Sequence, residues 1–286
     1  MDNITMFVVP VTGAPDHNPW EVKLYFVRLF STITELSIPS GLTFQDHISE
    51  AQLVEATHAT HSEDACKTIV QDTLMLSKTG YETSVTSEHF VRSMISAIDV
   101  SHITHLSLPL WPVECGPHHI KLLHASRTTI THLTLDMRSF TKDDASLRIR
   151  PQARDLWAQL DLVSCRSLEA LRFVFYSHRY DFDCWTHVID ILSTLPPSTS
   201  LQNITFQTSF EHPLTVQDRE VSIPWSRLQD VLLSYAQVGS VVWSVERWAD
   251  ARLMGVTEES ISEALAILKG RCAFEFCEFL TDWGLE

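Results

Sequence analysis

Two six-residue segments of this chain are nearly identical, and they constrain its fold more than any other feature. The segment that starts at Ile103 reads Ile-Thr-His-Leu-Ser-Leu, and the one that starts at Ile130 reads Ile-Thr-His-Leu-Thr-Leu. Their starts lie 27 positions apart (130 − 103). Near-copies at such a spacing predict a repeated structural unit in which each copy supplies one strand.

Both segments contain a three-point apolar pattern that recurs along the chain. Two residues separate the first apolar residue of the pattern from the second. One residue separates the second apolar residue from the third. The last two share a side of a strand because alternate side chains point the same way, and the first closes the layer at the turn into the strand. The pattern occurs at Ile33-Leu36-Ile38, Ile103-Leu106-Leu108, Ile130-Leu133-Leu135, Leu168-Leu171-Phe173 and Leu201-Ile204-Phe206.

The segment between the last two copies has the spacing of an amphipathic helix. Its apolar residues fall on one helical face: Trp185, Val188, Ile189, Leu192 and Leu195. One strand–helix unit cannot bury its own apolar face, whereas stacked units bury each other's. We therefore predict an α/β fold with a parallel sheet on one face and helices on the other.

The spacing of the leucines resembles the leucine-rich-repeat family, whose core is L-x-x-L-x-L-x-x-N/C-x-L. The likeness extends over about two thirds of the chain. The position that holds Asn or Cys in that family is occupied here by Trp111, Arg138, Tyr176 and Ser209. Because an asparagine ladder is missing, the resemblance implies an irregular leucine-rich-repeat-like solenoid.

Three further segments narrow the resemblance. They are the run from Cys165 to Leu171 (Cys-Arg-Ser-Leu-Glu-Ala-Leu), Leu192-Ser-Thr-Leu-Pro196, and Pro224-Trp-Ser-Arg-Leu228. Together they resemble the C-terminal repeats of mushroom-type fungal F-box/leucine-rich-repeat proteins. In that family the F-box recruits a ubiquitin-ligase adaptor and the repeats hold the ligase substrate. No segment of this sequence shows the F-box pattern.

The repeat pattern predicts a single domain over residues 1–286, interrupted between residues 39 and 100. Helical spacing over 51–61, from Ile69 to Leu76 and from Phe90 to Ile98 predicts a helical insertion there, with a long loop as the alternative. Toward the C-terminus, Pro224-Trp225 predicts a helix, although 228–233 also reads as a strand. A last helix is expected from Thr257 to a stop at Gly270, followed by a strand over 272–279.

Charge excludes two classes of partner. The formal net charge is −15, from 21 basic and 36 acidic residues. Nucleic-acid binders usually carry a basic patch or stripe, and anionic membranes repel an acidic surface, so we expect neither partner. Protonation of all 14 histidines would bring the charge to −1 (−15 + 14), so solubility should fall in mildly acidic buffer.

Cysteine usage and apolar runs predict the compartment. The six cysteines form no regular framework, and the chain starts without the basic and apolar segments of a signal peptide. No apolar run approaches the length of a membrane span. We therefore expect a cytoplasmic or nuclear protein with reduced thiols.

Two clusters suggest chemistry. Cys115, His118, His119 and His124 are ligand-type residues, but structural metal sites need about four converging ligands, and a polar helix end with a buried thiol explains them better. We predict no metal and no cofactor. The second cluster is an acid–histidine group after the central strand, which comprises His178, Asp181, Asp183 and His187. It suggests a general base and hence an α/β hydrolase-like alternative, although no G-x-S-x-G motif accompanies it.

Aromatic residues follow the predicted strands. Tyr176, Tyr180 and Phe182 follow the central strand, and Trp111 follows an equivalent one. Loops after parallel strands gather on one rim, where aromatic side chains act as anchors of protein interfaces. These four are the predicted partner-binding residues; the alternative is that they fill the interior. The predicted function is a non-catalytic protein–protein interaction module, with a scaffold unrelated to ubiquitin ligation as a further alternative.

Overall fold

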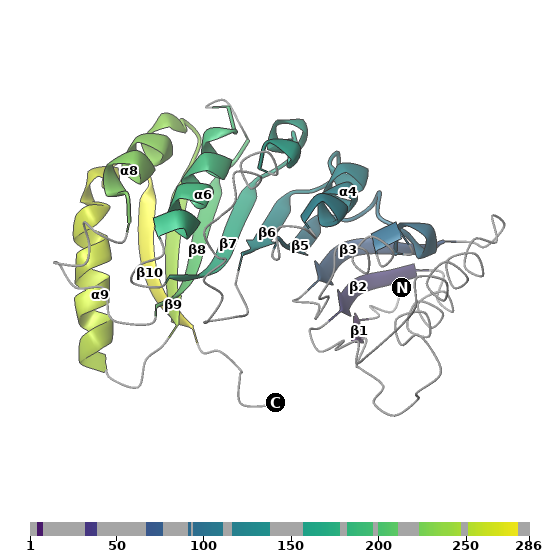
Figure 1. Ribbon diagram of the computed structural model, residues 1–286, viewed down its shortest axis with the longest axis horizontal. Coiled ribbons are helices and arrows are strands. Elements are labelled where there is room, and N and C mark those ends of the chain that lie inside the picture. Colours follow the sequence, from purple (N-terminus) through teal and green to yellow (C-terminus); the bar gives the residue numbers. More distant parts are fainter. Residues whose placement is uncertain are drawn as a thin grey trace. The chain divides into compact units, whose positions relative to one another are not determined.

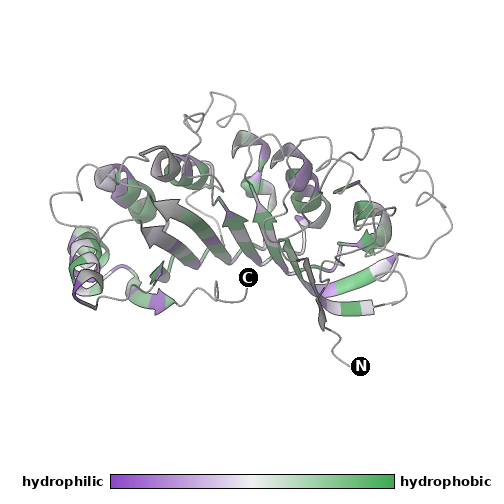
Figure 2. Ribbon diagram, turned by 60° about the horizontal axis from the view of Figure 1, so that its bottom comes forward, coloured by the Kyte–Doolittle hydropathy of each residue, from purple (hydrophilic) through white to green (hydrophobic). Residues whose placement is uncertain are grey.

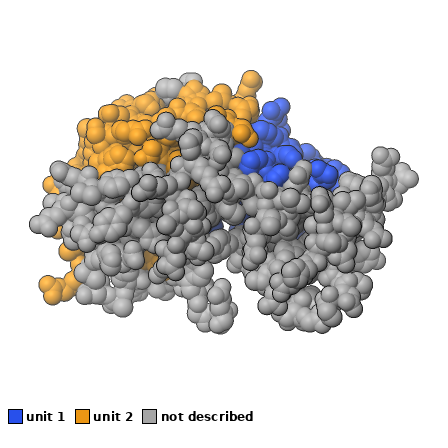
Figure 3. Space-filling model, viewed as in Figure 1, with its two compact units in different colours: residues 1–136 blue, residues 137–286 orange. Residues whose placement is uncertain are grey.

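The computed structural model describes residues 5–7, 32–38, 67–76, 91–92, 94–110, 116–137, 157–177, 182–196, 200–210, 223–246 and 251–279. The chain divides into two compact units, residues 1–136 (unit 1) and residues 137–286 (unit 2) (Figure 3). The sequence-based expectation of one continuous domain stays a prediction.

Unit 1 contains a parallel sheet whose strands follow one another in chain order (Figure 1). Strand β1 (Thr5–Phe7) pairs with β2 (Thr32–Ile38), β2 with β3 (Thr68–Leu76), β3 with β5 (His105–Pro109), and β5 with β6 (His132–Asp136). The short strand β4 (Ile98–Asp99) also pairs with β3. Helix α4 (Gly116–Ser126) connects β5 to β6.

A row of leucines forms the core of this sheet. Leu36, Leu74, Leu106 and Leu133 pair with one another across four strands, and none is more than 2% exposed. Leu108 and Leu135 form a second buried pair. The three-point pattern therefore predicted the buried positions of β5 and β6 correctly, as well as Ile33 and Leu36 of β2, and the parallel sheet is confirmed.

Strand β3 corrects the prediction of a helix from Ile69 to Leu76. Its buried residues are Thr68, Val70, Leu74 and Leu76, which alternate as in a strand apart from one shift. The β-branched residues concentrated at its start favour an extended chain. Residues 91–92 and 94–97 are helical as expected, but Ile98 already belongs to β4. Residues 51–61 lie outside the described part of the chain.

Unit 2 also contains parallel strands in chain order. Its strands are β7 (Ala170–Ser177), β8 (Asn203–Phe210), β9 (Ser240–Glu246) and β10 (Ala273–Phe279). The connections contain α6 (Phe182–Ser193), α8 (Trp225–Ser234), α9 (Ala251–Ala264) and η3 (Ala266–Leu268), and η2 (Leu162–Ser164) precedes β7. In Figure 1 these α-helices form a row beside the row of strands.

The helix-facing side of this sheet is aromatic. Phe173, Phe206, Trp243 and Phe276 form one row across the four strands. Trp185 from α6 contacts this row, with its ring centroid 5.7 Å from that of Phe206 and 4.9 Å from that of Trp243. Bands of hydrophobic and hydrophilic residues alternate along the strands (Figure 2), as expected for a sheet with one buried face.

The C-terminal helices match the prediction in part. Residues 225–234 form a helix, so the rival strand is wrong. Helix α9 begins at Ala251 rather than Thr257, which is fully buried within it. Gly270 follows with φ of 89°, a left-handed conformation suited to glycine at a helix end. Within the described residues, every helix falls short of the length and apolarity needed to cross a membrane.

Candidate functional site

The outward face of unit 1 is polar. The residues that directly precede the four leucines of the core row also pair with one another across the same four strands. They are Glu35, Thr73, His105 and His132. These side chains point away from the core because neighbouring residues of a strand alternate between faces. All four are partly or fully exposed, so they form a row available to solvent.

A register shift places a carboxylate beside this row. Ile33 pairs with Val70 but Glu35 pairs with Thr73, so β3 holds one residue more than β2 in this interval. Such bulges re-aim side chains. Here the extra length puts the main-chain carbonyl of Asp72 within 2.9 Å of the amide nitrogen of Thr104, where it accepts a hydrogen bond.

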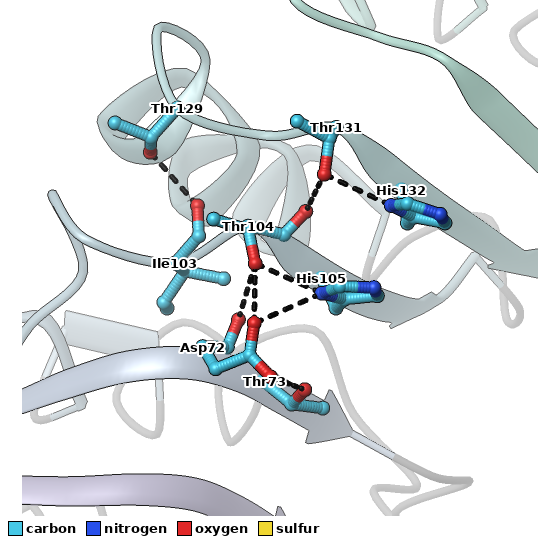
Figure 4. A network of polar contacts seen from close by, with 8 residues as sticks. All are labelled: Asp72, Thr73, Ile103, Thr104, His105, Thr129, Thr131 and His132. Atoms are coloured by element: carbon cyan, nitrogen blue, oxygen red, sulfur yellow. Dashed lines mark hydrogen bonds and ion pairs between the residues drawn. The ribbon is translucent and has the colours of Figure 1, made fainter.

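The side chains of Asp72, Thr104, His105, Thr131 and His132 form the histidine network shown in Figure 4. His105 Nδ1 lies 3.1 Å from Asp72 Oδ1 and 2.8 Å from Thr104 Oγ1. Thr104 Oγ1 also donates to Asp72 Oδ1. In the next strand, His132 Nδ1 lies 2.9 Å from Thr131 Oγ1. The two imidazole rings stack, with centroids 4.1 Å apart and planes 17° apart.

The network holds Asp72 in its charged form. The hydrogen bond from Thr104 lowers the pKa of Asp72 most, and the charge and hydrogen bond of His105 lower it further, against the opposing effect of burial. The side chains of His105 and Asp72 are 43% and 49% exposed. This is a solvent-accessible polar surface and not an enclosed cavity.

The histidine network does not have the geometry of a nucleophile-activating triad. In such a triad the hydroxyl lies at one ring nitrogen and the carboxylate at the other. In the network, Thr104 Oγ1 and Asp72 Oδ1 both lie at Nδ1 of His105. The arrangement is suited to holding the ring in position.

The outward face of unit 2 carries a second polar row. Arg172, Thr205, Val242 and Glu275 pair across β7 to β10 and are partly or fully exposed. The guanidinium of Arg172 donates a hydrogen bond to the side-chain oxygen of Gln207 on the next strand. The following row is more covered, since Val174 and Ser244 are only 8% exposed.

The Cys–His cluster noted in the sequence is dispersed in the described residues. His119 is buried in α4, and its Nδ1–H donates to the carbonyl oxygen of Pro109 at 2.6 Å. Burial lowers the pKa of His119 to about 4. His124 is exposed on the same helix, and Cys115 lies outside the described residues. Within the described segments, no group of three or more His, Cys, Asp or Glu side chains is placed to hold a metal ion.

One member of the acid–histidine group after the central strand, His187, is buried in the core of unit 2. His187 is 5% exposed, and its Nδ1 accepts a hydrogen bond from the indole nitrogen of Trp157 at 2.6 Å. This contact gives His187 a structural role between α6 and the helical segment that contains Trp157. His178 and Asp181 lie outside the described residues, as does the side chain of Asp183, so their part of the hydrolase alternative stays untested.

The four predicted partner-binding aromatics also stay predictions. Trp111 and Tyr180 lie outside the described residues. Tyr176 belongs to β7, where it pairs with Ser209, and Phe182 is the first residue of α6; only the backbone of these two residues is described.

The sequence contained the signal for the histidine network, because the Thr-His pair recurs in the two near-copies. Parallel strands in equal register bring equivalent residues side by side, so His105 pairs with His132. Asp72 had no comparable signal, since its place depends on the shift in β3. Comparisons with protein-family models, with curated proteins and with solved structures find no match to this chain.

Proposed function

We propose that this chain is a non-catalytic protein-interaction module that binds a protein partner through the outward faces of its parallel strands. In its finer form the proposal is an irregular leucine-rich-repeat-like solenoid. By the resemblance of its C-terminal segments to fungal F-box proteins, the partner would be a substrate of a ubiquitin ligase.

The observation that carries the proposal is the asymmetry of the sheet in unit 2. Its helix-facing side is filled by Trp185 and the aromatic row, whereas Arg172 and Glu275 on the other side are exposed. A rigid, pleated surface with side chains at fixed spacing suits recognition of a protein surface, because little order is lost on binding. The solvent-accessible histidine network on unit 1 supports the same conclusion.

Affinity purification with a matched pair of variants tests this function. Arg172→Ala combined with Gln207→Ala removes the polar pair of the outward face. Arg227→Ala is the control, since its side chain is 53% exposed on α8 and its ion pair with Asp190 is a surface contact of small energetic value. We expect the outward-face variant to lose proteins that the wild type and the control retain.

Equal recovery of all proteins by the three forms would contradict binding through this face. A third variant, Tyr180→Ala combined with Phe182→Ala, separates the predicted rim anchors from the sheet face. Recovery of the ubiquitin-ligase adaptor with the wild type would favour the ligase link, and its absence would favour a scaffold without one.

A further inference from the structure

The last strand of unit 2, β10, has an open edge. Within the described residues it pairs with β9 alone, so it ends the order of strands. The amide nitrogen of Ala273 donates to the carbonyl oxygen of Gly239, directly before β9, at 2.8 Å. Successive residues of a strand direct their main-chain polar groups to opposite edges. Phe274 and Phe276 therefore present their N–H and C=O groups to the open edge, where a further strand can pair with them.

The apolar side chains of β10 are less covered than those of β9. Val241 and Trp243 of β9 are fully buried, whereas Phe274 and Phe276, which pair with them, are only half-buried. Strand β9 has a neighbouring strand on each side, and β10 has one among the described residues. A strand added beside β10 would remove this remaining apolar surface from water, which favours its binding.

We propose that the open edge of β10 binds an extended segment of a basic protein, which adds to the sheet as one further strand. In this mode of recognition the main-chain hydrogen bonds give affinity and alternate side chains give specificity. Side chains of the added strand beside Phe274 and Phe276 would be apolar. The side chain between them would be Lys or Arg, because it lies beside Glu275, which is exposed on the outward face.

Charge favours a basic segment over a second copy of this chain. Every copy carries a formal net charge of −15 and places Glu275 within its edge strand. A charged side chain on an edge strand is one of the devices by which proteins prevent edge-to-edge association with their own kind. The same charges attract a partner of opposite charge. This surface is separate from the outward face through which we propose that the chain binds its partner.

Fluorescence anisotropy tests the site on the full chain, with a short labelled peptide in which Val and Lys alternate. We expect Glu275→Lys to weaken binding at least about fivefold relative to Glu169→Lys, because it replaces an attractive cross-strand pair by a repulsive one. Glu169 is an exposed residue directly before β7, so its substitution is a control that makes the same change in net charge. Equal affinities of the two variants would overturn the proposal.

Two N-methylated peptides test the main-chain pairing without altering the protein. One carries the methyl groups on its Lys amides and the other on its Val amides. A strand pairs with β10 through one of its edges only, so one peptide should bind as the parent does and the other should not. Binding by both would overturn strand addition.

Hydrogen exchange with mass spectrometry locates the bound peptide. Fragments that cover β10 should exchange more slowly with the parent peptide, and fragments that cover α4 should not change. Absence of protection in β10 would contradict the assignment to this edge. Sedimentation of the chain alone tests for a second copy at the edge: a dimer that dissociates on addition of the parent peptide would overturn the choice of a basic partner.

Discussion

The histidines of this chain differ in their surroundings, and the surroundings decide what each side chain can do. His119 and His187 are buried, and Nδ1 of each is engaged by a protein group. His105 and His132 are held by hydroxyl groups at Nδ1 and lie on the outward face of a sheet. The buried pair therefore contributes to stability, whereas the outward pair is accessible to solvent.

Burial of His119 predicts a loss of stability in acid. Its pKa is about 4 in the folded chain and about 6.5 when unfolded, so the unfolded state binds the proton more readily between these values. The stabilising contribution is complete above pH 6.5 and is lost as the pH falls toward 4. We expect a loss of up to about 3 kcal/mol from this group.

Urea unfolding of the wild type and of His119→Asn at several pH values between 7 and 4 measures this contribution. The amide of asparagine can still donate to the carbonyl of Pro109 but does not titrate. The variant should therefore show a shallower decline in unfolding free energy. Parallel declines in the two proteins would show that His119 is not the titrating group.

Among the elements, α6 connects the strands of unit 2 through one side chain. Trp185 is fully buried, and its ring lies edge-on to that of Phe175 with centroids 4.7 Å apart. It also contacts Phe206 of β8 and Trp243 of β9. A single residue of one helix therefore packs against three neighbouring strands.

Trp185→Ala should lower the unfolding free energy by about 3–5 kcal/mol, because it leaves a large cavity among rings that cannot collapse into it. Val163→Ala is the control, since that side chain is 53% exposed and should change stability by no more than about 0.5 kcal/mol. Chemical denaturation followed by circular dichroism measures both. A loss below about 1 kcal/mol for Trp185→Ala would contradict this packing.

The sequence predicted elements well where apolar residues had a regular spacing. Leu171 and Phe173, like Ile204 and Phe206, are buried as the three-point pattern required. The prediction failed at β3, because Ile69 and the later leucines fit a helical spacing nearly as well, and only pairing with β2 and β5 decides between the two.

The candidate site was harder to predict than the elements, because it depends on contacts between distant residues. The recurrence of Thr-His in the near-copies indicates that His105 and His132 are equivalent, but stacking requires the parallel register of β5 and β6. Asp72 joins them through a bulge that no local pattern indicates. Ring geometry therefore required the structure.

On the scale of the whole molecule, both units follow one plan: parallel strands in chain order, a buried apolar row and an outward polar row. The net charge of −15 makes a basic protein surface the most favourable partner. The expected charge of −1 at full histidine protonation is not reached in mildly acidic buffer, since His119 stays neutral well below pH 6.

Site-specific photo-crosslinking in cells that express the chain tests the proposed interaction face most directly. A photoreactive amino acid at Thr205 samples the outward face of β8, and one at the exposed Glu258 samples α9. We predict that the Thr205 probe captures a defined protein and that the Glu258 probe does not. Capture from Glu258 with none from Thr205 would contradict binding through the outward face of the sheet.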